Sequence, residues 1–541
     1  MPTTRPFLTR PRPAPAWLGS IPPAVPEFVM GVVGRIPPLR TLVSRLAINS
    51  FAYAVAPRPR PLSMVSPYTS WKSLTDRTFT GRHLPPADAE WKAKLPSEAD
   101  VVALYKRETF TPSTDTSVLF SMFAQWFTDS FLRTDPFDPR KNTSNHEIDL
   151  CQIYGLSEAK TDLLRLKSPD AGTRGRLRSQ LIDGQEFPDF LFEPGRTPGT
   201  RPTIKAQFKD LHDESWLLDV ILAGAPDDRL DQVFAVGLEH GNSTIGNTIM
   251  NTVFLREHNR VAGLIEAAHG DWDDDRVFQT ARNVVIVLLL HLVVEEYIKH
   301  IAPFEMPLET VKFIADGQRW NRSNWIAIEF NLLYRWHPLV PDAIGTGPDA
   351  IDADGMRNNN PLVIEAGIES LISRCSNARA GKIGLGNTPW FLVDRSDPAR
   401  PSVEERTVHI SRVAELRSFN EYREAFGQKK LASFDDLTSD PQLRATLSAM
   451  YGGDIDQLEW YVGIFAEEYP SYMMMGELLS TMVACDAFTQ ALTNPLLGRH
   501  VYGPDAFSPE GLEVIETTKT LHQIVQRNCP LGSKVECSFR L

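Results

Sequence analysis

Two residues within residues 329–342 could carry redox chemistry together. The sequence there is EFNLLYRWHPLVPD, in which Tyr334 precedes His337 by three positions. Residues three apart on a helix lie one turn apart on the same face, and we expect the helix to end at His337 because Pro338 follows. A histidine at a helix end could bind the metal of a large planar cofactor, and a phenol one turn away could exchange an electron with it. Taken alone, the pattern also fits a histidine that only caps the helix.

The elements that must position this pair are mostly helices. Apolar residues recur at helical spacing in several long stretches, namely 116–133, 247–267, 278–300, 323–335, 456–469 and 476–492. The Pro and Gly clusters between them are typical of loops inside one domain, and no repeat divides the chain. We therefore predict a mainly α fold with one large helical catalytic domain over residues 63–541.

The N-terminal part differs from that domain. Residues 1–26 are rich in proline, which predicts an extended or disordered arm. Residues 27–62 contain apolar stretches with sparse arginines, interrupted at Pro37 and Pro38. We expect short amphipathic helices there, which could lie in a membrane interface or pack on the domain. No run reaches the roughly 20 apolar residues of a membrane-spanning helix, and Val284 to Val294 fits a buried core helix.

The composition excludes some classes of protein. A net charge of -12 without a basic stripe argues against nucleic-acid binding. The N-terminus has no apolar core of a signal peptide, so we expect a soluble or peripherally membrane-associated protein on the cytoplasmic side. The five cysteines include no CxxC pair, which disfavours a cysteine zinc site. Cys529 and Cys537 are close enough in sequence to form a disulfide, or both are reduced thiols.

The chain resembles the cyclooxygenase-like branch of the animal haem peroxidase superfamily, which includes fatty-acid alpha-dioxygenases and linoleate dioxygenases. Tyr334, Arg335, Trp336 and His337 match the Tyr-x-Trp-His motif of its proximal haem segment. Eight further strings follow the family order: TSWKSLTDRTFTGRHLPP (69–86), FAQWFTDSF (123–131), IDLCQIYG (148–155), FLREHNRVAGLI (254–265), VVEEYIKHI (293–301), RSFNEYREAFG (417–427), YGGDIDQLEWYVG (451–463) and DAFTQALTNPLL (486–497).

The resemblance implies a cofactor and a mechanism. We expect haem b, with its iron on His337 and with Trp336, Asn331 and Tyr461 beside it. Tyr461 could orient the His337 ring, or it could be an ordinary core tyrosine. Tyr334 would become a radical and remove a hydrogen atom from an unsaturated fatty acid, to which O2 then adds, giving a hydroperoxide. A peroxidase of small reductants and a haem-binding protein without turnover are the alternatives.

The distal side departs from the family pattern. Gln125 is present, but Asp129 stands where the family has a histidine that exchanges protons with peroxide. Asp129 could do this work if burial raised its pKa, and His240 could share it from another segment; both could also be inert. Ser130 replaces the residue that binds calcium in the family, so we expect no calcium. His258, in LREHNR, is expected to be structural.

The expected lipid channel departs as well. The tyrosine that helps to hold the substrate carboxylate corresponds to Phe304, and no arginine aligns with its partner, although Arg40 and Arg45 are near. The serine that aspirin acetylates corresponds to about Ala487. These differences favour a single dioxygenation over formation of an endoperoxide from arachidonate. The sequence does not determine the oligomeric state, and a homodimer is one possibility.

Overall fold

The computed structural model describes residues 30–53, 77–302 and 306–541, so the predicted arm over 1–26 and the expectation for Phe304 lie outside the described residues. Its α-helices are α2 (Pro37–Ala52), α4 (Ala89–Lys92), α5 (Glu98–Ala103), α6 (Val118–Thr128), α7 (Cys151–Tyr154), α8 (Glu158–Leu164), α9 (Glu214–Trp216), α10 (Asp227–Leu230), α11 (Ile245–Ala268), α12 (Asp274–Leu292), α13 (Ile298–Ile301), α14 (Ile328–Leu333), α15 (Asn360–Ala366), α16 (Ile368–Asn377), α17 (Trp390–Val393), α18 (Val403–Val413), α19 (Phe419–Ala425), α20 (Pro441–Met450), α21 (Trp460–Ala466), α22 (Glu477–Leu492), α23 (Pro504–Thr517) and α24 (Leu521–Arg527). The 3-10 helices are η3 (Ala206–Phe208), η6 (His337–Leu339), η7 (Ile455–Gln457) and η8 (Pro495–Leu497), and the π-helical turns are η4 (Leu217–Ile221) and η5 (Val293–Tyr297).

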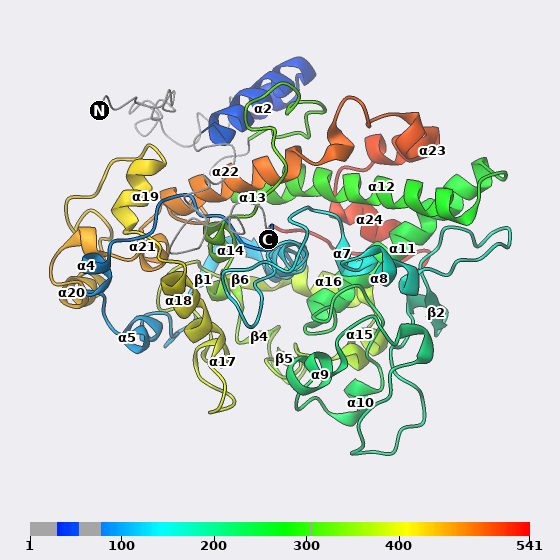
Figure 1. The fold of residues 1–541 in the computed structure, drawn as a ribbon, viewed down its shortest axis with the longest axis horizontal. Coiled ribbons are helices and arrows are strands. Elements are labelled where there is room, and N and C mark those ends of the chain that lie inside the picture. The colour runs from blue at the N-terminus through cyan, green and yellow to red at the C-terminus, as the bar shows by residue number, and fades with distance from the viewer. Residues whose placement is uncertain (1–29, 54–76, 303–305) are drawn as a thin grey trace.

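Strands contribute little to the architecture. Three antiparallel pairs join β1 (Pro112–Ser117) to β6 (Arg379–Gly381), β2 (Ser179–Ile182) to β3 (Gln185–Pro188), and β4 (Ala343–Ile344) to β5 (Ile351–Asp352). All of them are short and lie among the helices (Figure 1). The predicted mainly α fold is confirmed.

Helix α11 crosses the core. Its first turn is capped by Thr244, whose side chain accepts a hydrogen bond from the backbone N–H of Asn247. Nearly every residue from Ile245 to Ala262 is buried, including Glu257. The carboxylate of Glu257 is held by Arg260 and Arg527, so its burial is compensated.

Helices α12 and α13 are joined through η5 into one long apolar rod that lies beside α11 (Figure 1). In the part of the chain that the structure describes, one helix, Asp274–Ile301, is long and apolar enough to span a membrane, contrary to the expectation from sequence. Its most apolar window is 83% buried inside the protein. It is therefore a core helix, as predicted for Val284 to Val294.

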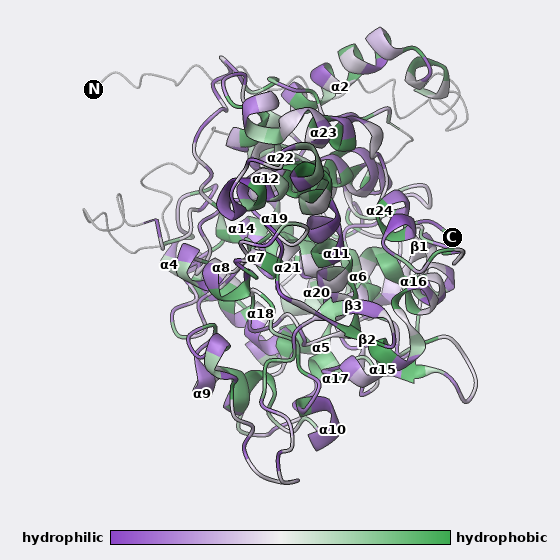
Figure 2. Ribbon diagram, turned by 90° about the vertical axis from the view of Figure 1, so that its right-hand side faces the viewer, coloured by the Kyte–Doolittle hydropathy of each residue, from purple (hydrophilic) through white to green (hydrophobic). Residues whose placement is uncertain are grey.

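Helix α2 packs on α22 and lies at the same end of the molecule as α12 and α23 (Figures 1 and 2). A helical stretch over residues 30–34 precedes it, and the break falls at Arg35 and Ile36, just before Pro37 and Pro38. Proline lacks a backbone N–H, so it fits the first turn of a new helix but does not continue an existing one.

Candidate active site

The backbone breaks between Tyr334 and His337, which corrects the predicted helix end. Helix α14 ends at Leu333, Tyr334 is its C-terminal cap, and His337 begins the 3-10 turn η6. Pro338 occupies the first turn of η6, where its missing N–H costs nothing. Tyr334 and His337 therefore belong to two different elements. They do not lie one turn apart on a common helix, as the sequence predicted.

His337 is held from one side by a buried carboxylate. Its Nδ1 lies 2.6 Å from Oε2 of Glu404, whose side chain is fully buried in α18. The hydroxyl of Tyr461 donates to Oε1 of the same carboxylate at 3.0 Å. With Nδ1 engaged, Nε2 is the ring nitrogen available to a metal. Tyr461 thus reaches His337 through Glu404, in the orienting position that the sequence left open.

Glu404 was not found from the sequence. It lies 67 positions after His337, in a segment that carries no recognisable motif of its own. The local sequence pattern beside Glu404 is a capping box. Ser402 and Glu405 form it, and it fixes the start of α18. A capping box predicts where a helix begins, and it does not indicate what an adjacent carboxylate contacts.

Asn331 supports the next residue of the motif. Its side-chain amide donates to Oγ1 of Thr134 at 2.9 Å, and its Oδ1 accepts from Arg335 at 2.7 Å. Burial lowers the pKa of the Arg335 guanidinium. Asn331 therefore positions Arg335 from the buried side of α14.

Tyr334 lies in an aromatic cluster. The ring centroid of Trp336 is 4.7 Å from that of Tyr334, and Trp336 also stacks on Tyr297 and Phe120. The hydroxyls of Tyr334 and Tyr297 are both buried without a hydrogen-bond partner of good geometry. Burial raises the pKa of Tyr334 far above its ordinary value, so the phenol keeps its proton.

A cavity of about 1000 Å³ opens beside this segment. Its lining includes Arg335 and Thr407 as well as Asp129 and His240. The structure therefore brings the two predicted distal residues to one cavity. His337 and Trp336 do not line it, whereas Arg335, which precedes Trp336, and Val403, which precedes Glu404, do.

Asn247 donates hydrogen bonds to both Asp129 and His240. The side-chain amide of Asn247 donates to Oδ2 of Asp129 at 3.1 Å and to the backbone carbonyl of His240 at 3.0 Å. Burial raises the pKa of Asp129 to about 6. Partial desolvation beside the cavity lowers the pKa of His240, although 43% of its side chain is exposed. Gln125 lies one turn before Asp129 on α6 and is exposed.

Two other candidates are structural. Nδ1 of His258 accepts from the Tyr154 hydroxyl at 2.9 Å, and Nε2 faces the carbonyl of Gly175 at 2.8 Å. Both ring nitrogens are occupied, as expected of a structural histidine. The hydroxyl of Ser130 donates to the carbonyl of Phe127.

All five cysteines are free, so the alternative of a Cys529–Cys537 disulfide is not realised.

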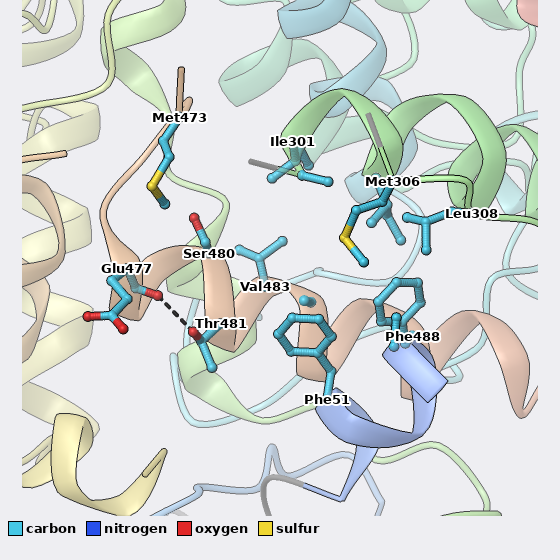
Figure 3. A pocket seen from close by; sticks show the side chains of 14 residues that line it. Phe51, Ile301, Met306, Leu308, Met473, Glu477, Ser480, Thr481, Val483 and Phe488 are labelled. Atoms are coloured by element: carbon cyan, nitrogen blue, oxygen red, sulfur yellow. Dashed lines mark hydrogen bonds between the residues drawn. The ribbon is translucent and has the colours of Figure 1, made fainter. Parts of the chain in front are cut away.

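A second, apolar cavity lies between α2, α13 and α22 (Figure 3). Its volume is about 160 Å³. Phe51, Ile301, Met306, Val483 and Phe488 point into it, and Glu477 lies toward one end. Helix α22 packs on α14, whose C-terminal cap is Tyr334, and it also carries Val483, Ala484 and Phe488 of the cavity lining.

Comparisons with known proteins identify the family of the chain. The model of the family described as animal haem peroxidase matches residues 131–538. Prostaglandin G/H synthase 1 of Rattus norvegicus is 30% identical over 511 residues, which cover 92% of this chain and 78% of that protein. Prostaglandin G/H synthase 2 of Bos taurus is 28% identical, covering 93% of this chain and 80% of that protein.

Solved structures share the fold at lower identity. The fatty acid alpha-dioxygenase of Arabidopsis thaliana superposes with a TM-score of 0.67 at 16% identity, covering 92% of this chain and 88% of that one. Peroxidase A of Dictyostelium discoideum gives a TM-score of 0.67 at 20% identity, covering 86% of this chain and 95% of that one. With the family match over most of the chain, these findings show that the protein is an oxidoreductase and belongs to the animal haem peroxidase family, in its cyclooxygenase-like branch.

Proposed function

We propose that the protein is a haem-dependent dioxygenase that adds O2 to an unsaturated fatty acid through a radical on Tyr334. The observation that carries the proposal is the place of Tyr334. It is a buried phenol three positions before the carboxylate-held His337, at the end of a helix that packs on α22, and α22 lines the apolar cavity. Relatives named prostaglandin G/H synthase and solved structures named fatty acid alpha-dioxygenase support the fatty-acid substrate.

The large cavity and the segment beside it together offer the groups that would hold a haem: Arg335 lines the cavity, and His337, two positions later, lies outside its lining. A cavity of about 1000 Å³ is at the upper end of the sizes of ligand sites. Arg335 and Arg406 line it, and among the described residues neither has a carboxylate within 4 Å. His337 would hold the iron through Nε2, and the two guanidinium groups would hold the carboxylates of the cofactor. When bound, the haem supplies one-electron oxidation after reaction with a peroxide.

The side chains of the protein perform the remaining steps. Tyr334 would give one electron to the peroxide-oxidised cofactor and its phenolic proton to water, and so become a neutral radical. It then takes a hydrogen atom from a weak C–H bond of an acyl chain in the apolar cavity, which restores its O–H and leaves a carbon radical. O2 adds to that carbon, and the peroxyl radical takes a hydrogen atom back from Tyr334. The net reaction joins one fatty acid and one O2 into one hydroperoxide.

Oxygen uptake with linoleate and oleate, measured for the parent and for Tyr334→Phe with equal haem content, tests this proposal. We expect uptake by the parent and loss of at least two orders of magnitude in the variant, because phenylalanine keeps the packing and removes the O–H. Equal lipid oxidation by both proteins would exclude the radical role of Tyr334.

A peroxidase of small reductants is the second candidate, favoured by the open cavity beside the exposed ring of His240. It predicts peroxide-dependent oxidation of a phenol such as guaiacol, with no oxygen uptake on linoleate by the parent. A haem-binding protein without turnover predicts neither activity.

We also propose that α2 contacts a membrane surface. Large apolar side chains are exposed at Ile36, Leu39, Leu42 and Leu46, which share one face of the helix by their spacing. Flotation with neutral phosphatidylcholine vesicles, compared between the parent and Leu42→Ser/Leu46→Ser, tests this. Equal flotation of both proteins, or none by the parent, would contradict it.

A further inference from the structure

A third cavity lies under the N-terminal end of α2, where α2 meets α12, α13 and the segment before α24. Its volume is about 680 Å³. Its polar lining includes Arg40, His291, Lys299, Thr310, Lys312 and Lys519. Leu308 lines both this cavity and the apolar cavity, so one wall separates the two. None of these residues takes part in the mechanism proposed above.

Two buried polar side chains in this cavity have no partner. The ring of His291 is 3% exposed, and neither of its nitrogens has a hydrogen bond. Its Nδ1 lies 3.8 Å from Glu295, which is too far for a hydrogen bond. The hydroxyl of Thr310 is also buried without a partner. A neutral imidazole and a hydroxyl each carry one donor, and an unmet buried donor costs about 1–3 kcal/mol.

Two lysines that line the cavity have no carboxylate partner among the described residues. Glu309 pairs with Arg40 at 2.7 Å, and Glu516 pairs with Lys312 at 3.1 Å. The carboxylate of Glu295 accepts the backbone N–H of Thr310 at 3.0 Å. In the part of the chain that the structure describes, Lys299 and Lys519 have no carboxylate within 4 Å. Glu295 also lines the cavity without a Lys or Arg within 4 Å among the described residues, so its carboxylate offsets one of the two lysines. The unpaired groups are therefore two neutral donors and a net single positive charge, which fit an anion with several acceptor oxygens.

The surroundings identify the source of that anion. Arg40, on the rim of the cavity, belongs to the same helix as the exposed stripe Leu39, Leu42 and Leu46. A net charge of -12 repels an anionic membrane as a whole, so attraction to one needs a local site. We propose that this cavity binds the phosphate of an anionic phospholipid headgroup, with Lys299, Lys519, His291 and Thr310 as its donors. The proposal rests on the membrane contact proposed for α2.

Vesicle binding by the full-length, haem-loaded protein tests the proposal. Vesicles of phosphatidylcholine alone are compared with vesicles that also contain phosphatidic acid, for the parent, for Lys299→Ala/Lys519→Ala and for the control Lys209→Ala/Lys534→Ala. The control removes the same charge at exposed lysines that do not line the cavity. We expect the parent to bind the anionic vesicles at least about tenfold more tightly than the neutral ones. The cavity variant should lose this preference but keep its binding to neutral vesicles, and the control should retain both.

The remaining outcomes distinguish a lipid headgroup from a free anion. They also separate the headgroup site from the membrane contact proposed for α2. His291→Phe keeps the charge of the cavity and removes a buried donor, and it should reduce the preference for phosphatidic acid. Calorimetry with inorganic phosphate serves as the second arm. Phosphate binding that is lost in the lysine variant, without a preference among vesicles, would overturn the lipid source in favour of a free anion. No preference and no phosphate binding would overturn the site. Failure of the parent to bind any vesicle would overturn the contact of α2 and the lipid source together.

Discussion

Glu404 gives His337 an anionic partner inside the protein. A carboxylate that accepts the ring N–H of a metal-bound histidine fixes the orientation of the ring and makes the other nitrogen a stronger donor. Both oxygens of Glu404 are occupied, by His337 and by Tyr461. The side chain therefore has one orientation, and the histidine has one tautomer.

Replacing the carboxylate by an amide tests this electronic effect. Glu404→Gln keeps the size of the side chain and removes its charge, so we expect haem affinity to fall about 10–100-fold. The reduction potential of the iron should rise, since the less basic ligand stabilises the oxidised metal less. Potentiometry and haem titration measure both, with Tyr461→Phe as a control that keeps the charge of Glu404. An unchanged potential in Glu404→Gln would contradict the role.

The raised pKa of Asp129 predicts a pH dependence. Burial raises the pKa of this carboxyl from 3.8 to about 6, so it becomes a base only above that pH. We expect the rate of peroxide consumption by the haem-loaded parent to increase as the pH rises through about 6. This increase, one limb of the pH profile, should be absent in Asp129→Asn. A limb that persists in Asp129→Asn but disappears in His240→Phe would assign the proton transfer to His240.

At the scale of residues, the sequence was informative where a motif is contiguous. Asn331, Tyr334 and His337 lie within seven positions, so one contiguous motif proposed all three as site residues. Glu404 contacts His337 only because α18 packs beside η6, and that packing leaves no trace in local spacing.

At the scale of elements, helical periodicity located the helices better than it located their ends. The stretch 476–492 corresponds closely to α22, whereas 323–335 shrinks to α14, and 456–469 shrinks to α21. A pattern of apolar residues continues through a break in the backbone when both sides of the break are buried. The end of α14 depends on η6 and Pro338, which a periodic pattern does not detect.

Helix α21 carries Tyr461, and its position depends on a glycine. A Cβ added at Gly463 would overlap the ring of Phe419 in α19. We expect Gly463→Ala to lower stability by about 1–3 kcal/mol, because overpacking outweighs the gain in helix propensity. Thermal unfolding measures the loss. The control is Gly503→Ala, where an added Cβ meets nothing within 4 Å. Equal melting temperatures of the two variants would contradict the close contact.

At the scale of the whole molecule, the sequence predicted the class of fold and the single large domain but not the long-range pairs that close it. His83 and Asp486 are 403 positions apart, and they form a buried ion pair at 3.0 Å. This pair ties the start of the catalytic domain to α22. Nothing near either residue in the sequence indicates the other.

The same pair predicts how stability depends on pH. Burial opposes the charge of His83, but the facing carboxylate of Asp486 outweighs it and raises the pKa of His83 from 6.5 to about 9. A raised pKa adds stability that is complete below about pH 6.5 and is lost as the pH rises through 9, which amounts to about 3 kcal/mol. Urea unfolding between pH 6 and 10 should show this loss in the parent and not in His83→Gln. His409→Gln, at an exposed histidine, should behave like the parent.

The rod formed by α12 and α13 also bears on how the chain is synthesised. One of its faces is covered by α23, whose residues 504–517 leave the ribosome more than 200 positions after the rod. A stretch as apolar as a membrane span thus stays partly uncovered through the synthesis of about two fifths of the chain. Chaperones that bind nascent chains recognise such surfaces. The order of translation therefore makes a truncation before α23 an aggregation hazard, even though the haem-side residues would all be present.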